Sequence, residues 1–210
     1  MSGTTPAAAS IGRSIAPVLA VMTLTLSLDQ ASKAWAWNTL RGAPGRVAGD
    51  GLVSFAFAFN PGAAFGLAAS HPTAPLGFFV AASVGLGILI RLGLRAETPA
   101  MRVAAGLGAG GIAGNLIDRL IRNHPRRIDW LREATFADFL EHPTAIADAI
   151  ASQHRYLDIP RHGVIDFVVV SYGPGRTWPA FNLADAAIVV ALAWLVVQTI
   201  SPPRHRVGRR

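Results

Sequence analysis

Residues 101–121 read MRVAAGLGAGGIAGNLIDRLI, an apolar run rich in alanine and glycine that ends on polar side chains. A helix that crosses the hydrocarbon core of a bilayer needs about 20 mainly apolar residues, and this run has that length. Polar groups at the end of such a run are costly to place in a membrane and are functional candidates by default. The stretch therefore predicts a membrane-spanning helix with a candidate site at one end.

Three further apolar stretches extend this interpretation outward along the chain. They cover residues 15–37, 73–94 and 179–200, and glycines at 77, 85 and 87 in the second of them suit close helix packing. We expect one integral membrane domain over residues 1–210. The predicted fold class is a membrane all-α protein with a small β element, in which four transmembrane helices carry an outer β-structure.

The composition supports a membrane class and excludes several others. Of the 210 residues, 51% are hydrophobic and 15% are charged, against about 25% charged residues in an average soluble domain. This excludes a disordered chain. The chain has no cysteine, which excludes disulfides, thiolate metal sites and cysteine nucleophiles. The six histidines form no HExxH motif, which argues against a metalloprotease, so no metal site is expected.

The positions of the basic residues predict the orientation. Four spans place both termini on one side, and the two tails with the 91–102 loop hold eight basic residues against one acid. The other side holds eleven of each, spread over longer loops. Basic density next to spans marks the cytoplasmic side, so both termini are expected there. Basic residues in flanks rather than on one contiguous face argue against a nucleic-acid partner.

Two strands and an insertion are expected on the outer side. Phe55, Phe57 and Phe59 alternate within 52–59, and the β-branched stretch 164–170 is bounded by glycines, which favours a strand in each. Residues 123–163 form a polar insertion whose apolar residues recur at near-helical spacing on either side of a proline. We expect two short amphipathic helices there, with their acids on a solvated face.

Four clusters of polar residues lie at span ends. They are DQASK at 29–33, NPGAAFG at 60–66, GGIAGNLIDR at 110–119, and the pair VIDF at 164–167 and FNLAD at 181–185. Asp29 precedes Lys33 by four residues, the favourable order for a helical ion pair, and we expect this pair at the membrane interface. An interfacial ion pair of Asp118 with the adjacent Arg119 is expected at the end of the third span.

Asp166 and Asp185 differ from the other acids. Asp185 lies about five residues into the predicted fourth span, with no basic residue within four positions, and shares a predicted helix face with Asn182. An unpaired carboxylate at that depth either binds a proton or shares one with another acid. A turn at Gly173–Gly175 lets the strand that holds Asp166 fold back toward it. A small proton-coupled transporter that relays protons through both acids is the alternative interpretation.

Taken in order, the five blocks resemble the lipoprotein signal peptidase family, the bacterial signal peptidase II family of membrane aspartyl proteases. The likeness extends over residues 15–200. It implies four transmembrane helices with an outer β-cradle, and it places the two catalytic aspartates on Asp166 and Asp185. The substrate-binding and supporting residues that it implies are Asp29, Lys33, Asn60, Gly62, Asn115, Asp118, Arg119 and Asn182.

The resemblance also implies a reaction, partners and a location. The reaction is hydrolysis of the peptide bond before the diacylglyceryl-modified cysteine of a bacterial prolipoprotein, without a cofactor. The implied partners are these substrates, membrane lipids and lipopeptide inhibitors of the globomycin type. The implied location is the bacterial inner membrane, with the active site near its outer face. Two features depart from the family pattern: the insertion 123–163, where the family has a handful of residues, and Pro61.

Overall fold

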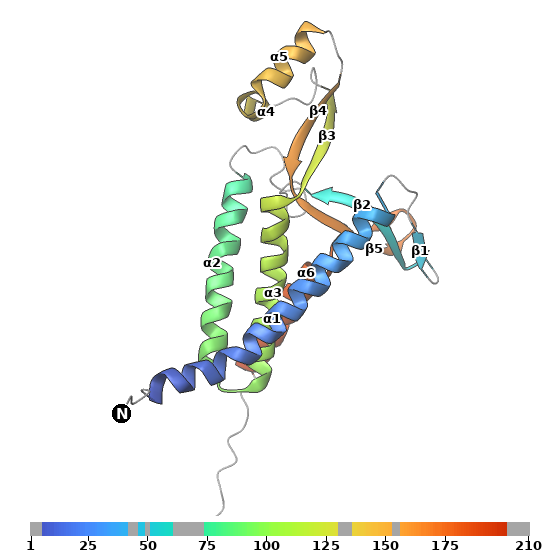
Figure 1. Cartoon of the computed structure of the whole chain (residues 1–210). Coiled ribbons are helices and arrows are strands. Elements are labelled where there is room, and N and C mark those ends of the chain that lie inside the picture. Colours follow the sequence, from blue (N-terminus) through green and yellow to red (C-terminus); the bar gives the residue numbers. More distant parts are fainter. Residues whose placement is uncertain are drawn as a thin grey trace, which may run out of the picture.

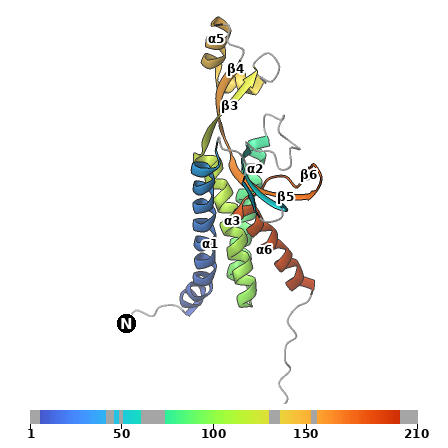
Figure 2. The ribbon, with the colours of Figure 1, turned by 90° about the vertical axis from the view of Figure 1, so that its right-hand side faces the viewer.

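Four long helices form the body of the protein. The computed structural model describes residues 6–41, 46–48, 51–60, 74–129, 136–152 and 156–200. The long helices are α1 (Pro6–Thr39), α2 (Ala74–Arg95), α3 (Pro99–Ile121) and α6 (Leu183–Ile200). The start of α1 and the end of α6 lie at one end of the bundle, and the strands lie at the other (Figures 1 and 2).

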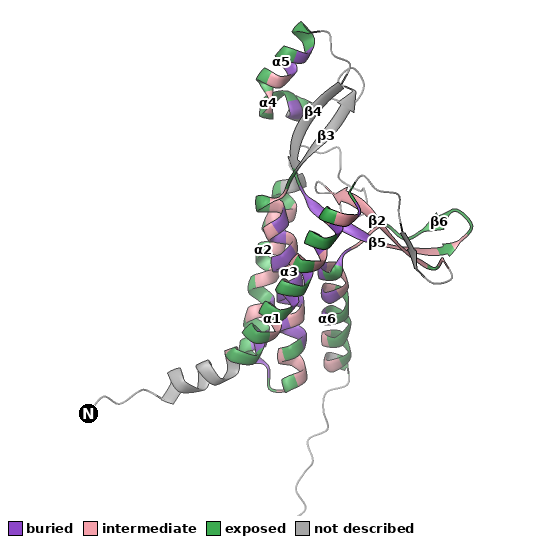
Figure 3. Cartoon of the chain, turned by 45° about the vertical axis from the view of Figure 1, so that its right-hand side comes forward, coloured by how far each residue is buried: buried purple, intermediate pink, exposed green. Residues whose placement is uncertain are grey.

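Helix α3 lies at the centre of this bundle and contacts α1, α2 and α6. Its glycines allow that arrangement. A Cβ atom added to Gly110 would lie 2.6 Å from the Met22 carbonyl oxygen on α1, and one added to Gly111 would lie 2.6 Å from the Ala184 carbonyl oxygen on α6. Buried residues accordingly concentrate on α3 (Figure 3). The small residues thus permit backbone-to-backbone packing on two sides of one helix.

Three helices in the described residues are long and apolar enough to cross a membrane: Ile15–Thr39, Leu76–Arg95 and Pro99–Ile121. They correspond to the first three predicted spans. The fourth predicted span, 179–200, is too long by four residues, because α6 begins at Leu183 and its apolar part, Leu183–Gln198, is shorter than the others. Asp185 therefore lies in the first turn of α6 rather than five residues into a helix.

Large apolar side chains cover the outside of the bundle. Leu24, Leu76, Val189 and Val197 are each more than half exposed. Monomeric soluble proteins rarely expose continuous apolar surfaces of this kind, whereas lipid tails cover them without cost. The packing thus agrees with the membrane class that the composition predicts.

A four-stranded antiparallel sheet packs on the end of α1. Its strands are β1 (Arg46–Ala48), β2 (Val53–Asn60), β5 (Val164–Gly173) and β6 (Arg176–Thr177), in that order across the sheet. Both predicted strands are confirmed in β2 and β5. Ala36 of α1 and Leu40, the residue directly after α1, are buried against Ile165 and Phe167 of β5. This contact fixes the strand that carries Asp166 against the bundle.

The insertion is a β-hairpin that carries two short helices away from the bundle (Figures 1 and 2). Strand β3 (Asn123–Asp129) pairs with β4 (Tyr156–His162). In the sequence between these two strands lie α4 (Phe136–Glu141) and α5 (Pro143–Ala151). The two helices were predicted, although residues 130–135 lie outside the described part. The expectation of solvated acids is wrong for Asp138, whose side chain is fully buried.

Candidate active site

The predicted site residues converge where α1, α3, β5 and the start of α6 meet. Asp29 and Lys33 come from α1, and Asn115, Asp118 and Arg119 come from α3. Asn60 ends β2, Asp166 lies in β5, and Asn182 directly precedes α6, which holds Asp185. Gly62 lies outside the described residues. Segments far apart in the sequence are therefore brought to one end of the bundle.

Asn182 joins the two aspartates. Its side-chain nitrogen donates to Asp166 Oδ1 at 2.7 Å. Its side-chain oxygen accepts from the backbone N–H of Asp185 at 3.0 Å, and its own backbone N–H donates to Asp185 Oδ2 at 3.2 Å. This reciprocal pair is a capping box, which satisfies orphan donors at a helix start. The cap that begins α6 thus also holds Asp166 and Asp185 next to one another.

Asp166 is 4% exposed and its environment favours the protonated form. Burial, together with the nearby Asp185 carboxylate, raises the pKa of Asp166 to about 7. Hydrogen bonds from Asn60 and Asn182 and the charge of Lys33 act in the opposite direction and are outweighed. A carboxyl group that titrates near neutral pH can hold or release a proton under physiological conditions.

A buried ionic cluster of Asp29, Lys33, Asp118 and Arg122 lies next to the aspartate pair. Lys33 Nζ lies 2.8 Å from Asp29 Oδ2 and 3.1 Å from Asp118 Oδ2, and all three side chains are fully buried. Arg122 Nε lies 2.8 Å from Asp118 Oδ1. Asp29 Oδ1 accepts from the backbone N–H of Ala184 at 3.0 Å. Two cations balance two carboxylates, which offsets part of the cost of removing these charges from water.

Two expectations about ion pairs need correction. The Asp29–Lys33 pair forms as predicted, but both side chains are fully buried within the bundle rather than extending to its surface. Asp118 pairs with Lys33 and Arg122, not with Arg119. Adjacent helical residues point about 100° apart, whereas residues four apart share a face. Arg119 instead donates to the Asn115 carbonyl oxygen at 3.4 Å.

Arg122 and Gln30 are parts of this site that the sequence analysis missed. Gln30 Nε2 donates to Asp118 Oδ1 at 3.1 Å, and Arg122 donates to Gln30 Oε1 at 3.2 Å. The backbone N–H of Ile165 approaches Asp118 Oδ2 at 3.4 Å, one residue before Asp166. The four-residue spacing of Asp118 and Arg122 could have indicated their pairing. The partner of Gln30 has no such local signal.

The side chains of the described residues form no group of three or more His, Asp or Glu suited to hold a metal ion. The site contains two adjacent carboxyl groups, three asparagine amides and the Arg119 guanidinium. Arg119 Nε is buried without a hydrogen-bond partner in the part of the chain that the structure describes. Such an arrangement can move protons, orient a polar substrate and donate hydrogen bonds to it.

Comparison with known proteins places the chain among membrane peptidases. Residues 21–201 match the family model of signal peptidase (SPase) II. A lipoprotein signal peptidase of Rhodococcus jostii is 31% identical over 163 residues, which cover 78% of this chain and 61% of that protein. One from Xanthomonas euvesicatoria is 30% identical over 174 residues, or 81% of this chain and 78% of that protein.

A bacterial membrane enzyme solved by the in meso method at 2.3 Å resolution has a similar fold. The TM-score is 0.61 at 16% sequence identity, over 92% of this chain and 93% of the other. The matches give no support to the proton-coupled transporter that the acids alone left open. The chain belongs to the signal peptidase II family.

Proposed function

We propose that the protein is an aspartic endopeptidase that removes the signal peptide of bacterial prolipoproteins, cleaving before the diacylglyceryl-modified cysteine. The observation that carries the proposal is the linkage of Asp166 and Asp185 through Asn182, inside a family match that spans residues 21–201. The proteins it resembles are lipoprotein signal peptidases, and the substrate class is taken from them.

The two aspartates act as one proton-sharing unit. Two like charges a few ångströms apart cannot both form cheaply, so the pair holds one proton near neutral pH. The ionised member takes a proton from water as this attacks the scissile carbonyl carbon, and the protonated member donates a hydrogen bond to the carbonyl oxygen. The raised pKa of Asp166 supports this division. The reaction needs no cofactor.

Asn60 and Arg119 orient the substrate backbone beside this pair. Asn60 Nδ2 donates to Asp166 Oδ2 at 3.2 Å, so it lies at the side of Asp166 away from Asn182. The guanidinium of Arg119 carries the positive charge that interacts with both aspartates. Gly62, two residues beyond Asn60, is assigned to the same role by the family resemblance. The four-stranded sheet then forms the outer cradle above the site.

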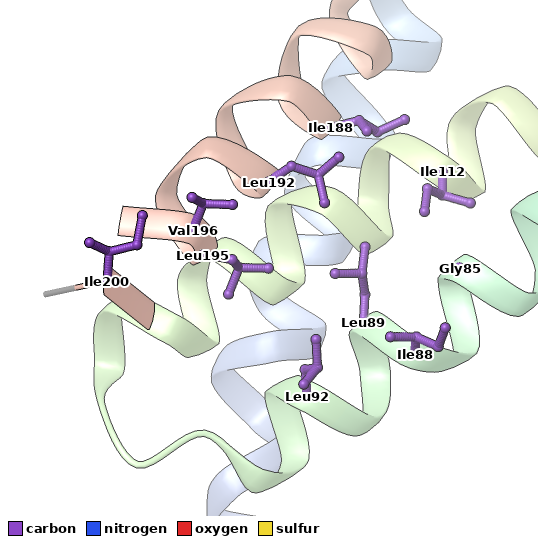
Figure 4. Close-up of a pocket in the computed structure, with 10 residues that line it drawn as sticks. All are labelled: Gly85, Ile88, Leu89, Leu92, Ile112, Ile188, Leu192, Leu195, Val196 and Ile200. Atoms are coloured by element: carbon purple, nitrogen blue, oxygen red, sulfur yellow. The ribbon is translucent and has the colours of Figure 1, made fainter. Parts of the chain in front are cut away.

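An apolar groove one helical turn below the site fits the lipid-modified part of the substrate (Figure 4). Ile188 lies three residues after Asp185, and Ile112 lies three residues before Asn115. The groove has a volume of about 570 Å³ between α2 and α6. Its lining residues are Gly85, Ile88, Leu89, Leu92, Ile112, Ile188, Leu192, Leu195, Val196 and Ile200. Substrate acyl chains and membrane lipids enter it from the side, and globomycin-type inhibitors block the site above.

The proposed frame is four spans in the bacterial inner membrane with both termini in the cytoplasm. Helix α6 is the fourth span, and the site and the hairpin face outward. The chain contains no cysteine, so Ile150→Cys, at a half-exposed position of α5, gives a single label. It should react with a membrane-impermeant maleimide in the intact inner membrane. Reaction only after access to the cytoplasm contradicts this orientation.

The direct test of function is cleavage of a diacylglyceryl-modified prolipoprotein by purified protein, with a chelator and without an ion gradient. We expect the signal peptide to be released, and we expect Asp166→Asn and Asp185→Asn to abolish release while the proteins stay folded. Unmodified precursor is the substrate control. A transporter would release nothing in this assay, and wild-type inactivity on the modified precursor would refute the proposal.

A further inference from the structure

The Asn115 side chain connects the buried ionic cluster to the aspartate pair. Its Oδ1 accepts from Lys33 Nζ at 2.8 Å, and its Nδ2 donates to Asp185 Oδ1 at 2.8 Å. An ammonium group has three N–H donors and no acceptor. The atom of Asn115 that faces Lys33 must therefore be the amide oxygen. The nitrogen is then turned toward Asp185.

All three N–H donors of the Lys33 ammonium group are used. Its three donors face Asp29 Oδ2, Asp118 Oδ2 and Asn115 Oδ1, at 2.8, 3.1 and 2.8 Å. A second contact, from Asn182 Nδ2 to Asn115 Oδ1, is longer at 3.3 Å and is shared with Asp166 Oδ1 at 2.7 Å. A short bond from a charged donor is stronger than a long, shared, neutral one. Lys33 is thus the main determinant of the orientation of the Asn115 amide.

Both oxygens of Asp185 consequently face donors of fixed direction. Oδ1 faces the Asn115 amide nitrogen, and Oδ2 faces the backbone N–H of Asn182 at 3.2 Å. A hydrogen-bond donor held at each oxygen favours the ionised form of Asp185. On Asp166, Oδ1 faces the Asn182 nitrogen, whose orientation is set because the Asn182 oxygen accepts from the Asp185 backbone. Oδ2 accepts from the Asn60 side-chain nitrogen at 3.2 Å. Asp166 is buried whereas Asp185 is partly exposed, and burial favours the neutral form of a carboxyl group, so the proton is favoured on Asp166.

We propose that Lys33 is a positioning residue for the reaction: it directs the Asn115 amide nitrogen at Asp185, which holds Asp185 as the ionised acid and leaves the shared proton on Asp166. Asp185 is then the group that activates water, and Asp166 polarises the carbonyl. The charged groups that interact with the pair are Lys33 on α1 and Arg119 on α3, and Asp118 in turn interacts with Arg119. Among these, Lys33 reaches Asp185 through two hydrogen bonds in series, by way of the Asn115 side chain.

Because this role rests on the proposed function, the test starts from a wild-type protein that cleaves. The readout is the pH profile of kcat/KM, whose acid limb reports protonation of the base in the free enzyme. In Lys33→Met the Asn115 amide can turn its oxygen toward Asp185. We expect the acid limb to move to higher pH by about one unit, the size of one lost hydrogen bond to a charged group. A merely structural role lowers activity without moving the limb.

Arg122→Met is the matched control. It also removes one cation from Asp118, but the Arg122 side chain contacts Asp118 and Gln30 rather than Asn115. We expect its acid limb to stay in place. An equal movement in Arg122→Met, or an unmoved limb in Lys33→Met, overturns the proposal.

The pair Asp29→Asn/Lys33→Met and Asp29→Asn/Arg122→Met repeats the comparison with a balanced buried charge, in case a single variant does not fold. The same movement in the lysine variant alone supports the role. If neither lysine variant folds while both arginine variants do, Lys33 serves folding and the proposal fails. Absence of cleavage in the wild type would instead refute the proposed function.

Discussion

The ionic cluster at the end of the bundle and the hairpin insertion above it are both rich in charge, yet they are held in opposite ways. In the cluster, Asp29 and Asp118 are fully buried, and each has at least one partner from another helix. In the insertion, α5 packs on β4 and α4 on α5, while Phe136 and Leu140 stay 75% and 64% exposed. Substitutions in the cluster should therefore act on the whole fold, and changes in the insertion should stay local.

The largest expected effect of a single change on stability is that of Asp118→Asn. The variant leaves Lys33 and Arg122 facing a neutral amide, and breaking one side of a buried ion pair costs about 3 kcal/mol. We expect a lower thermal unfolding midpoint and a lower yield in detergent. The fraction that folds should still cleave. An unchanged midpoint would remove the contrast between the two regions.

A smaller loss is expected from Gly114→Ala. The added Cβ would overlap Asp29 Oδ2, and overpacking of this kind costs about 2 kcal/mol. Gly87→Ala is the matched control on α2, because its Cβ meets nothing within 4 Å. Thermal unfolding of the two variants, measured side by side, should show a loss for Gly114→Ala alone. Equal losses would mean that helix propensity rather than close packing decides.

The pH dependence of cleavage and of stability should reflect Asp166 of the site rather than the ionic cluster or the insertion. Because burial raises the pKa of Asp166 to about 7, the protonated acid is present below that pH and is lost above it. Cleavage should fall about tenfold for each pH unit well above 7. The folded state also binds this proton more tightly than the unfolded state, so the unfolding free energy should decline as pH rises from about 4 to 7. Asp166→Asn should remove that decline in a thermal unfolding series.

The smallest effect is expected from removal of the insertion. Its root includes a backbone hydrogen bond from the Gly163 N–H to the Arg122 carbonyl oxygen at 3.3 Å, followed by the Asn123–His162 pair. Replacing residues 123–162 by a short Gly/Ser linker should leave measurable cleavage while changing KM for the precursor or membrane association. Complete loss of activity in a folded variant would show that the insertion belongs to the site.

Spacing along a helix predicted some contacts of the site and misassigned others. The Asp29–Lys33 pair follows from a separation of four residues. The same rule predicts Arg122 as the partner of Asp118. The expected pair with the adjacent Arg119 is wrong, because adjacent helical residues do not share a face. Asn182 and Asp185 were expected to share a helix face, and they form a helix cap instead, because α6 begins one residue after Asn182. Spacing along the sequence therefore predicts which residues belong to the site, whereas their contacts also depend on where each helix begins.

The hairpin of the insertion could not be predicted from its sequence. Pro125 and Pro160 stand opposite each other in β3 and β4, and proline within a stretch argues against a strand. These two strands pair only with each other, so the prolines disturb no neighbouring strand of a larger sheet. The Gln30–Asp118 and Asp29–Ala184 contacts were equally hidden, because they join residues 88 and 155 positions apart.

The most direct test of the catalytic assignment compares Asp166→Asn, Asp185→Asn and Asp118→Asn in one cleavage assay on the same diacylglyceryl-modified precursor. The amount of folded protein in each sample is measured by the binding of a globomycin-type lipopeptide. We predict that the first two variants bind the lipopeptide and cleave nothing, whereas the folded fraction of Asp118→Asn retains turnover. A folded Asp166→Asn protein with near-normal cleavage, beside a folded Asp118→Asn protein with none, would contradict the assignment.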